Sequence, residues 1–556
     1  MEKYLMDQQI TPESLIKLYQ ESLLQNWDLP LFSDYDGISY QYGEVAQKIH
    51  QIHLFYKASG IQKGDKIALL GRNSSNWGIV FLATLGYGAV AVPVLPDFNP
   101  SDVHHIVNHS ESSLLFVTDA LLEKLDLEAM GDLRGIIRLN TFELGGTPKK
   151  ALKDAWSQSL REGSVQPISP TEFQLEELAL EDACVISYTS GTSGFTKGVM
   201  VPVRSLLSNI VFAREHMPLK SGDRIVSFLP MAHVFGLLFE FLFPATLGCH
   251  ITFLTKAPTP QVIIKAFAEI KPRLILSVPL VIEKIYKKRI QPAIEKPSMK
   301  FLLKVPILSS VIRKKVREKL VETFGGCFHE IVIGGAPLSK EVEVFFRKIK
   351  FPFTIGYGMT ECGPLISYDA WQTTQPSSAG KLVDRMQVRI DSDDPYRQVG
   401  EIQVKGMNTM LGYYKNEEAT EQAFTEDGWL RTGDLGLIDS QNYIFIKGRS
   451  KNMLLGPSGQ NIYPEEIEAK LGNMSGVLEN VVVERDGKLV ALVFPDSELV
   501  DAEQMDEEAV KKLMDHNRRV VNKELPKYSQ VSQIEIVEEE FEKTPKRNIK
   551  RYLYTS

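Results

Sequence analysis

Short apolar runs alternate with longer helical patterns over the first 350 residues of this 556-residue chain. Several of the runs are apolar at consecutive positions, which predicts strands that are covered by helices on both faces. The predicted strands are 66–71, 89–95, 114–118, 184–189, 224–229, 250–254, 274–278 and 330–333. This alternation indicates an α/β layered architecture.

From about residue 388 to residue 447 the pattern changes to β-rich segments with glycine-containing turns. A compact tail follows, with a predicted helix that begins at Pro464, two apolar strands and a helix near 506–525. Pro464 is followed by glutamates, which is typical of a helix start because proline fits the first turn and acids face the positive end of the dipole. We predict a small α+β domain with its boundary at 449–452.

Two apolar stretches raise the question of a membrane span. Residues 77–96 carry no charge, and residues 225–255 carry only that of Glu240. Both stretches contain glycine, proline and short β-branched runs, so we interpret each as a buried helix next to a buried strand rather than as a spanning helix. The N-terminus has no apolar core of signal-peptide length.

The composition excludes several classes of protein. Hydrophobic residues make up 43% and charged residues 24%, which excludes a disordered or fibrous chain. A formal charge of −7 argues against a general nucleic-acid binder, which needs clustered positive charge. The four cysteines are far apart and suggest no disulfide framework, so we expect a cytoplasmic protein.

One segment departs from this charge balance. Residues 284–320 hold twelve Lys or Arg and two Glu, with apolar residues between them. The segment is either a solvated helical face or a docking surface for anionic phosphates, of a cofactor or of lipid headgroups. The second interpretation predicts peripheral contact with the inner face of an anionic membrane.

A loop rich in glycine and hydroxyl groups follows the apolar run 183–186. Its glycines let the backbone approach an anion closely, and consecutive N–H groups in such a loop form an anion-binding concavity. Lys197 adds a positive charge. The predicted phosphate-binding residues are Thr189, Ser190, Gly191, Thr192, Ser193, Gly194 and Lys197. The spacing does not fit a Walker loop.

This loop, 189–198, resembles the phosphate loop of the adenylate-forming (AMP-binding) superfamily. The similar motifs continue in order at 229–236, 334–338, 357–361, 432–436, 448–451 and 458–468. The resemblance implies a large N-terminal domain, 1–448, of αβαβα-type sheets with a β-rich subdomain at about 388–448. It also implies a small mobile α+β C-terminal domain, 449–556.

The resemblance further implies an AMP-forming ligase that joins a carboxylic acid to ATP and then to a thiol, usually that of coenzyme A. Positive charge must then offset the repulsion between the carboxylate and the phosphates. Glu361 would bind Mg²⁺, Thr360 would lie at the α-phosphate, and His233 would lie at the acyl carboxylate. The remaining predicted nucleotide contacts are Gly335, Ala336, Pro337, Tyr357, Gly358, Met359, Asp434 and Arg449.

The C-terminal motifs carry one departure from the family pattern. Lys451 occupies the hinge position, and Ser458 and Gly459 would border the thiol tunnel. Asn548, however, stands where the family has a lysine that bridges the carboxylate and the α-phosphate. Lys546 or Lys550 could replace that lysine.

The basic insertion resembles the long-chain fatty acyl-CoA synthetase branch, and the apolar stretch 235–243 could line an acyl tunnel or simply pack in the core. We therefore expect a fatty acid, ATP and coenzyme A as substrates. Two alternatives stay open: a ligase for another acid or for acyl carrier protein, and a protein that binds ATP or acyl-AMP with little turnover, which Asn548 would explain.

Overall fold

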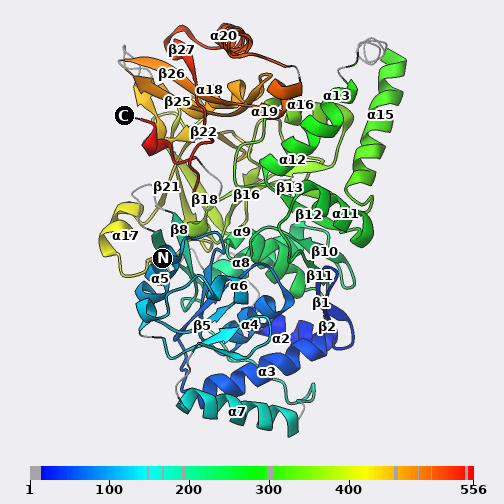
Figure 1. The fold of residues 1–556 in the computed structure, drawn as a ribbon, viewed down its shortest axis with the longest axis vertical. Coiled ribbons are helices and arrows are strands. Elements are labelled where there is room, and N and C mark those ends of the chain that lie inside the picture. The colour runs from blue at the N-terminus through cyan, green and yellow to red at the C-terminus, as the bar shows by residue number, and fades with distance from the viewer. Residues whose placement is uncertain are drawn as a thin grey trace.

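The computed structural model of the protein describes residues 14–131, 133–146, 150–165, 168–190, 196–294, 296, 306–455, 461–485, 487–502, 504–544 and 549–555. Figure 1 shows the blue and cyan N-terminal elements at the bottom of the view and the orange and red C-terminal elements at the top. Each of the eight predicted strands is present with ends shifted by at most two residues, and the α/β fold class is confirmed.

The largest sheet has eight strands in the order β20-β9-β8-β4-β3-β5-β6-β7. Its strands are β3 (Lys66–Leu70), β4 (Val90–Val94), β5 (Ser112–Val117), β6 (Gly135–Arg138), β7 (Leu144–Gly145), β8 (Ala183–Ser190), β9 (Thr196–Pro202) and β20 (Gly412–Tyr413). Ile67 and Leu69 join one buried core, whereas Ala68 and Leu70 join another. Both faces of the central strands are therefore covered, as their unbroken apolar runs require.

Helices cover the two faces of this sheet. α3 (Tyr42–Ala58), α4 (Ser75–Gly86) and α7 (Lys150–Val165) contribute to the larger core. α5 (Pro100–His109) places Val103, Ile106 and Val107 in the smaller core on the other face. α2 (Leu15–Gln25) packs against α3.

Two further sheets lie beside the first. One has the order β10-β11-β1-β2 and the other β12-β13-β14. Their strands are β1 (Pro30–Asp34), β2 (Ser39–Gln41), β10 (Arg224–Ser227), β11 (His250–Phe253), β12 (Leu274–Ser277), β13 (Glu330–Ile333) and β14 (Phe353–Ile355). The nearby helices are α8 (Val203–His216), α11 (Pro260–Ile270), α12 (Pro279–Ile285), α15 (Pro306–Thr323) and α16 (Lys340–Ile349).

The β-rich region is an antiparallel sheet with the order β18-β19-β21-β22. Its strands are β18 (Met386–Asp391), β19 (Gly400–Gly406), β21 (Leu430–Ile438) and β22 (Ile444–Arg449). α17 (Glu417–Ala423) precedes β21. A small sheet of β15 (Tyr357–Gly358), β16 (Leu365–Tyr368) and β17 (Lys381–Leu382) connects this region to β14.

The C-terminal elements build cores of their own. β25 (Val477–Arg485), β26 (Lys488–Pro495) and β27 (Gln533–Ile536) form a sheet that packs on α18 (Pro464–Leu471) and α20 (Glu507–Glu524). Two clusters of buried side chains draw only on residues between 454 and 554. α18 begins at Pro464, as the sequence predicts.

The two apolar stretches fold as helical segments and strands. Residues 77–96 contribute to α4 and β4. Residues 225–255 contain β10, the segment α9 (Val234–Gly236), η2 (Leu237–Leu242) and α10 (Phe243–Ala245), and then β11. Among the described residues, no helix combines the length and the apolar character needed to cross a bilayer.

The basic segment ends in α15, which Figure 1 shows in green at the right-hand edge of the molecule. Arg313, Lys314 and Lys315 are exposed there, and Val311 is 50% exposed. Residues 295 and 297–305 of the segment lie outside the described residues.

Candidate functional site

The predicted phosphate loop connects two paired strands. β8 and β9 are antiparallel, with Thr189 opposite Lys197 and Ser190 opposite Thr196. The loop therefore leaves the sheet at the carboxyl end of β8, where ligands of α/β sheets commonly bind. Gly191, Thr192, Ser193 and Gly194 lie outside the described residues.

Glu361 lies close to the base of this loop, and Tyr413 connects the two. The ammonium of Lys197 lies 4.8 Å from the centroid of the Tyr413 ring. The Tyr413 hydroxyl donates a hydrogen bond of 2.9 Å to Glu361 Oε1. Burial and the nearby Glu361 carboxylate raise the pKa of Tyr413, so this hydroxyl keeps its proton and remains a donor. Two segments more than 160 positions apart in the sequence thus share one small region.

The segment that carries Glu361 is held tightly. Thr360 is 4% exposed and Glu361 lies in the short turn η4 (Thr360–Cys362). The backbone N–H of Met410 donates to the carbonyl of Glu361 at 2.8 Å. A side chain at Gly358 would force the backbone to shift, because a Cβ there would lie 2.2 Å from the Pro364 carbonyl oxygen.

The carboxylate of Asp434 is a second polar centre. Asp434 lies opposite Arg449 across β21 and β22, and its Oδ1 is 3.1 Å from Arg449 Nε. Its Oδ2 accepts a hydrogen bond of 2.7 Å from the Tyr357 hydroxyl. Burial raises the pKa of Asp434, and the charge of Arg449 opposes that shift. Each carboxylate oxygen has a second lone pair, so both can still accept from a ligand hydroxyl.

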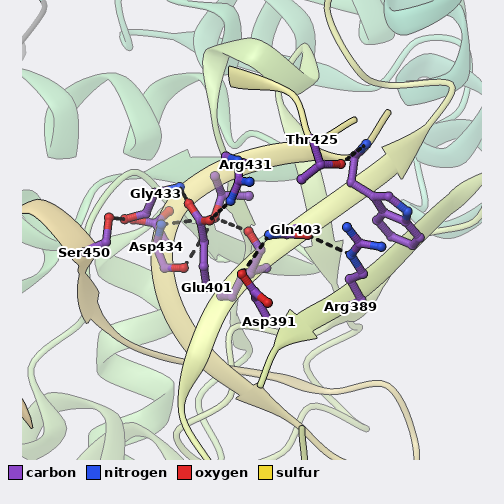
Figure 2. A network of polar contacts seen from close by, with 12 residues as sticks. Arg389, Asp391, Glu401, Gln403, Thr425, Arg431, Gly433, Asp434 and Ser450 are labelled. Carbon is purple, nitrogen blue, oxygen red and sulfur yellow. Dashed lines mark hydrogen bonds and ion pairs between the residues drawn. The ribbon is translucent and has the colours of Figure 1, made fainter. Parts of the chain in front are cut away.

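Figure 2 shows the polar contacts that fix the backbone on each side of Asp434. Glu401 accepts from the Gly433 N–H at 3.1 Å and pairs with Arg431 at 3.1 Å. The Ser450 hydroxyl donates to the Gly433 carbonyl at 3.1 Å. The turn that presents Asp434 is therefore bound from its own sheet and from the segment after Arg449.

The predicted adenine loop leaves β13 and reaches the segment of His233. Gly335 has a φ of +86°, a left-handed conformation that favours glycine. A Cβ at Gly334 would lie 3.1 Å from the ring of Phe235, so this loop packs directly on α9. After the loop, the Ser339 hydroxyl donates to Asn473 Oδ1 at 2.6 Å, which joins the loop to the C-terminal elements.

His233 begins the helix α9. Its Nδ1 accepts from the Phe235 N–H at 3.3 Å, and the side chain is half-buried. The aromatic residues that follow are core residues: Phe239, Phe241 and Phe243 are at most 1% exposed, and the Phe241 ring lies 5.6 Å from that of Phe32. These contacts favour core packing over a tunnel lined by these three side chains.

The C-terminal candidates are only partly described. Lys451 lies in the turn η5 (Ser450–Asn452). Ser458, Gly459, Lys546 and Asn548 lie outside the described residues. The ammonium of Lys550 is 3.2 Å from Glu542 and contacts no predicted nucleotide residue among those described.

Comparison with known proteins identifies the family. Residues 20–414 match the AMP-binding enzyme family, and residues 452–555 match the AMP-binding enzyme C-terminal domain. The chain therefore belongs to the AMP-binding enzyme family, which confirms the resemblance and the prediction of an enzyme.

Its relatives include long-chain-fatty-acid–CoA ligases. The chain is 28% identical to FadD15 of Mycobacterium tuberculosis over 467 residues, which covers 79% of this chain and 74% of the relative. It is 28% identical to heimdall of Drosophila melanogaster over 523 residues, which covers 86% of this chain and 75% of the relative.

Solved structures share the fold. ATP-bound MatB from Rhodopseudomonas palustris has a TM-score of 0.76 at 21% identity, with 97% of this chain and 98% of that chain covered. The o-succinylbenzoate coenzyme A synthetase MenE of Bacillus subtilis, in complex with ATP and magnesium, has a TM-score of 0.73 at 19% identity, with 96% and 98% covered.

Sequence reasoning missed Tyr413, Glu401 and Asn73, whose side chain binds the backbone of Leu229 and Met231. None of them belongs to a recognised motif, and each acts through a contact with a residue far away in the sequence. The one signal available in the sequence concerned another residue, Glu240. It is the lone charge in an apolar stretch, and a buried carboxylate there needs hydrogen-bond donors.

Proposed function

We propose that this protein is an ATP-dependent ligase that activates a long-chain fatty acid as an acyl-adenylate and transfers the acyl group to coenzyme A. The single observation that carries the proposal is the meeting of Lys197 and Glu361 at Tyr413. It brings the base of the phosphate loop and an acidic side chain to one place, as a nucleotide–magnesium site requires. The names of the relatives support the long-chain acid and coenzyme A.

The phosphate side of the site would act by charge. Lys197 and the loop 189–194 would hold the β- and γ-phosphates and offset the repulsion between ATP and the incoming carboxylate. Glu361 fits Mg²⁺, because one of its oxygens accepts from Tyr413 while the other accepts no hydrogen bond from the described residues. A bound Mg²⁺ would supply further positive charge at the phosphate oxygens.

The nucleoside side would act by hydrogen bonding. Asp434 would accept from the ribose hydroxyls with its second lone pairs, and Arg449 would donate to them. The backbone of 335–337 and the Tyr357 ring would enclose the adenine, beside Gly358 and Met359. Thr360 would lie at the α-phosphate and His233 at the acyl carboxylate.

The cation that bridges the carboxylate and the α-phosphate would come from Lys546 or Lys550. Arg551 binds the Val482 carbonyl at 2.7 Å and Glu468 at 2.6 Å, which anchors one end of the segment that contains both lysines. In the present state Lys550 pairs with Glu542, so it must leave that pair to act. Rotation at Lys451 would then bring Ser458 and Gly459 to the thiol path.

The test is pyrophosphate release from ATP and Mg²⁺ with palmitate, with and without coenzyme A. We expect pyrophosphate in both cases and palmitoyl-CoA when coenzyme A is present. Pyrophosphate without palmitoyl-CoA would favour acyl carrier protein as the acceptor. No pyrophosphate with any acid from octanoate to oleate would contradict the proposal and favour a binding protein with little turnover.

We also propose that the segment 284–320, and α15 in particular, contacts anionic membrane surfaces. Exposed Arg313, Lys314 and Lys315 provide the charge, and exposed Val311 an apolar contact. Co-sedimentation with vesicles that contain phosphatidylserine should fall as salt rises, whereas binding that does not respond to salt would contradict an electrostatic mode. Replacement of the three basic residues by Gln should have the same effect as salt.

A further inference from the structure

A buried polar cluster lies beneath the loop that leads to His233. Ser227, Glu240 and Asn73 are 0%, 1% and 6% exposed, respectively. They come from the end of β10, from η2 and from the segment between β3 and α4. Buried polar side chains are costly unless they satisfy other groups, so their hydrogen bonds indicate their role.

Glu240 binds two consecutive backbone donors. Its Oε2 accepts from the N–H groups of Phe228 and Leu229, each at 2.9 Å. Its Oε1 is buried without a hydrogen-bond partner among the described residues. Burial raises the pKa of this carboxyl well above its ordinary value. Oε2 can accept both bonds whether or not Oε1 carries a proton.

Asn73, from the segment between β3 and α4, binds the same loop. Its Nδ2 donates to the Leu229 carbonyl at 2.7 Å and to Ser227 Oγ at 3.0 Å. Its Oδ1 accepts from the Met231 N–H at 2.9 Å. Two side chains therefore satisfy four backbone groups of 228–231, where the chain leaves the sheet and loses the partners that a strand would provide.

His233 and the helix that it begins are in direct contact with this loop. The His233 N–H donates to the Pro230 carbonyl at 3.0 Å. A Cβ at Gly236 would lie 2.8 Å from the Pro230 carbonyl oxygen, so the first turn of the helix rests directly on the loop. A shift of 228–231 would therefore displace the imidazole.

We propose that Glu240 and Asn73 are positioning residues that hold the loop 228–231 and thereby set the position of His233 relative to the acyl carboxylate. This inference rests on the proposed function, because that function places the carboxylate at His233. Glu240 lies in η2, which is a π-helical segment. Such turns are frequent at functional sites.

The kinetic test compares Glu240→Leu with Glu240→Gln. The Leu variant leaves two buried N–H groups without an acceptor, and we expect kcat/KM for palmitate to fall about 100-fold while the KM for ATP stays unchanged. The Gln variant keeps the acceptor oxygen and should recover most of the activity. In a His233→Ala background, Glu240→Leu should cause no further loss, since the position of an absent imidazole cannot matter.

Glu330→Leu is the matched control. Glu330 is also fully buried and accepts from a backbone N–H, that of Trp371, and from the Tyr368 hydroxyl, so its hydrogen bonds lie outside the loop 228–231. Glu330→Leu should lower the stability of the protein without changing the KM for palmitate. A loss from Glu240→Leu that persists in full without His233 would overturn the proposal. Asn73→Ala tests the same loop if Glu240→Leu does not fold.

Hydrogen exchange provides a readout that does not depend on activity. Peptides that cover 228–236 should exchange faster in Glu240→Leu and Asn73→Ala than in the wild type, and Glu240→Gln should resemble the wild type. Unchanged exchange would show that neither side chain holds the loop. If the wild type releases no pyrophosphate, the proposed function fails, and exchange still decides whether Glu240 and Asn73 hold 228–231.

Discussion

The proposed ribose site around Asp434 and the loop 228–231 before His233 both depend on a buried carboxyl group, but they use it differently. Asp434 has a cation beside it, Arg449 at 3.1 Å, and a hydroxyl donor in Tyr357. Glu240 has no cation in contact among the described residues and accepts from two backbone N–H groups. Asp434 therefore keeps lone pairs that a ligand can use, whereas the hydrogen bonds of Glu240 go to the backbone of its own chain.

This difference separates a carboxylate proposed to bind a ligand from one proposed to position the chain. A buried charge with a cation partner can remain ionised and recognise a ligand, because the partner offsets part of the desolvation cost. A buried acid without a cation tends to keep its proton and serves as a fixed acceptor. Substitutions that change one carboxyl or one contact at a time can therefore tell the two uses apart.

The largest effect is expected at Glu361. Glu361→Gln keeps an oxygen for the Tyr413 hydroxyl but removes the negative charge proposed to hold Mg²⁺. We expect kcat/KM for ATP to fall by about 10²–10³, as for loss of one preorganised electrostatic contact, and the Mg²⁺ concentration at half-maximal rate to rise. Glu418→Gln, exposed on the nearby α17, is the matched control. An unchanged Mg²⁺ response would show that Glu361 does not bind the metal.

Asp434→Asn tests the binding carboxyl directly. It leaves Arg449 without its charged partner and weakens acceptance from the ribose, so we expect the KM for ATP to rise about 100-fold with a smaller change in kcat. Asp391→Asn, in the same sheet and exposed, removes a carboxylate whose one side-chain hydrogen bond among the described residues comes from Gln403, and it should have no effect on the KM for ATP (Figure 2). Equal effects of the two variants would contradict the ribose assignment.

The residues of the proposed ribose site could be predicted from the sequence, whereas the side chains that hold the loop before His233 could not. Asp434 and Arg449 belong to motifs, and long apolar runs such as 89–95 specify buried strands by themselves. Asn73 and Glu240 act through contacts that close only in the folded chain, and Asn73 lies 156 positions from the Leu229 carbonyl that it binds. Short strands such as β2 and β20 were also missed, because pairing rather than propensity forms them.

A pH series distinguishes the positioning carboxyl from the binding one. The pKa of Glu240 is raised in the folded protein above the 4.5 of an ordinary glutamate, so the folded state retains a proton that the unfolded state loses. Above pH 4.5 the wild type should therefore lose stability relative to Glu240→Gln, by up to about 1.4 kcal/mol per pH unit until the pH reaches the folded pKa. Unfolding midpoints in urea at several pH values measure this gap. A constant gap would show that Glu240 is ionised in the folded protein.

The smallest effect is expected where the predicted adenine loop meets the C-terminal elements. Ser339→Ala removes the hydrogen bond of 2.6 Å to Asn473, which links the end of the loop 334–338 to the turn after α18. Loss of one such bond is worth about 0.5–1.5 kcal/mol, so we expect a change of a few-fold in the ratio of the adenylation rate to the rate of transfer to coenzyme A. Asn473→Ala should match it, and the double variant should be no worse than either single one. Additive losses would show that the two side chains act separately, and the adenine loop would then not sense the C-terminal elements through this contact.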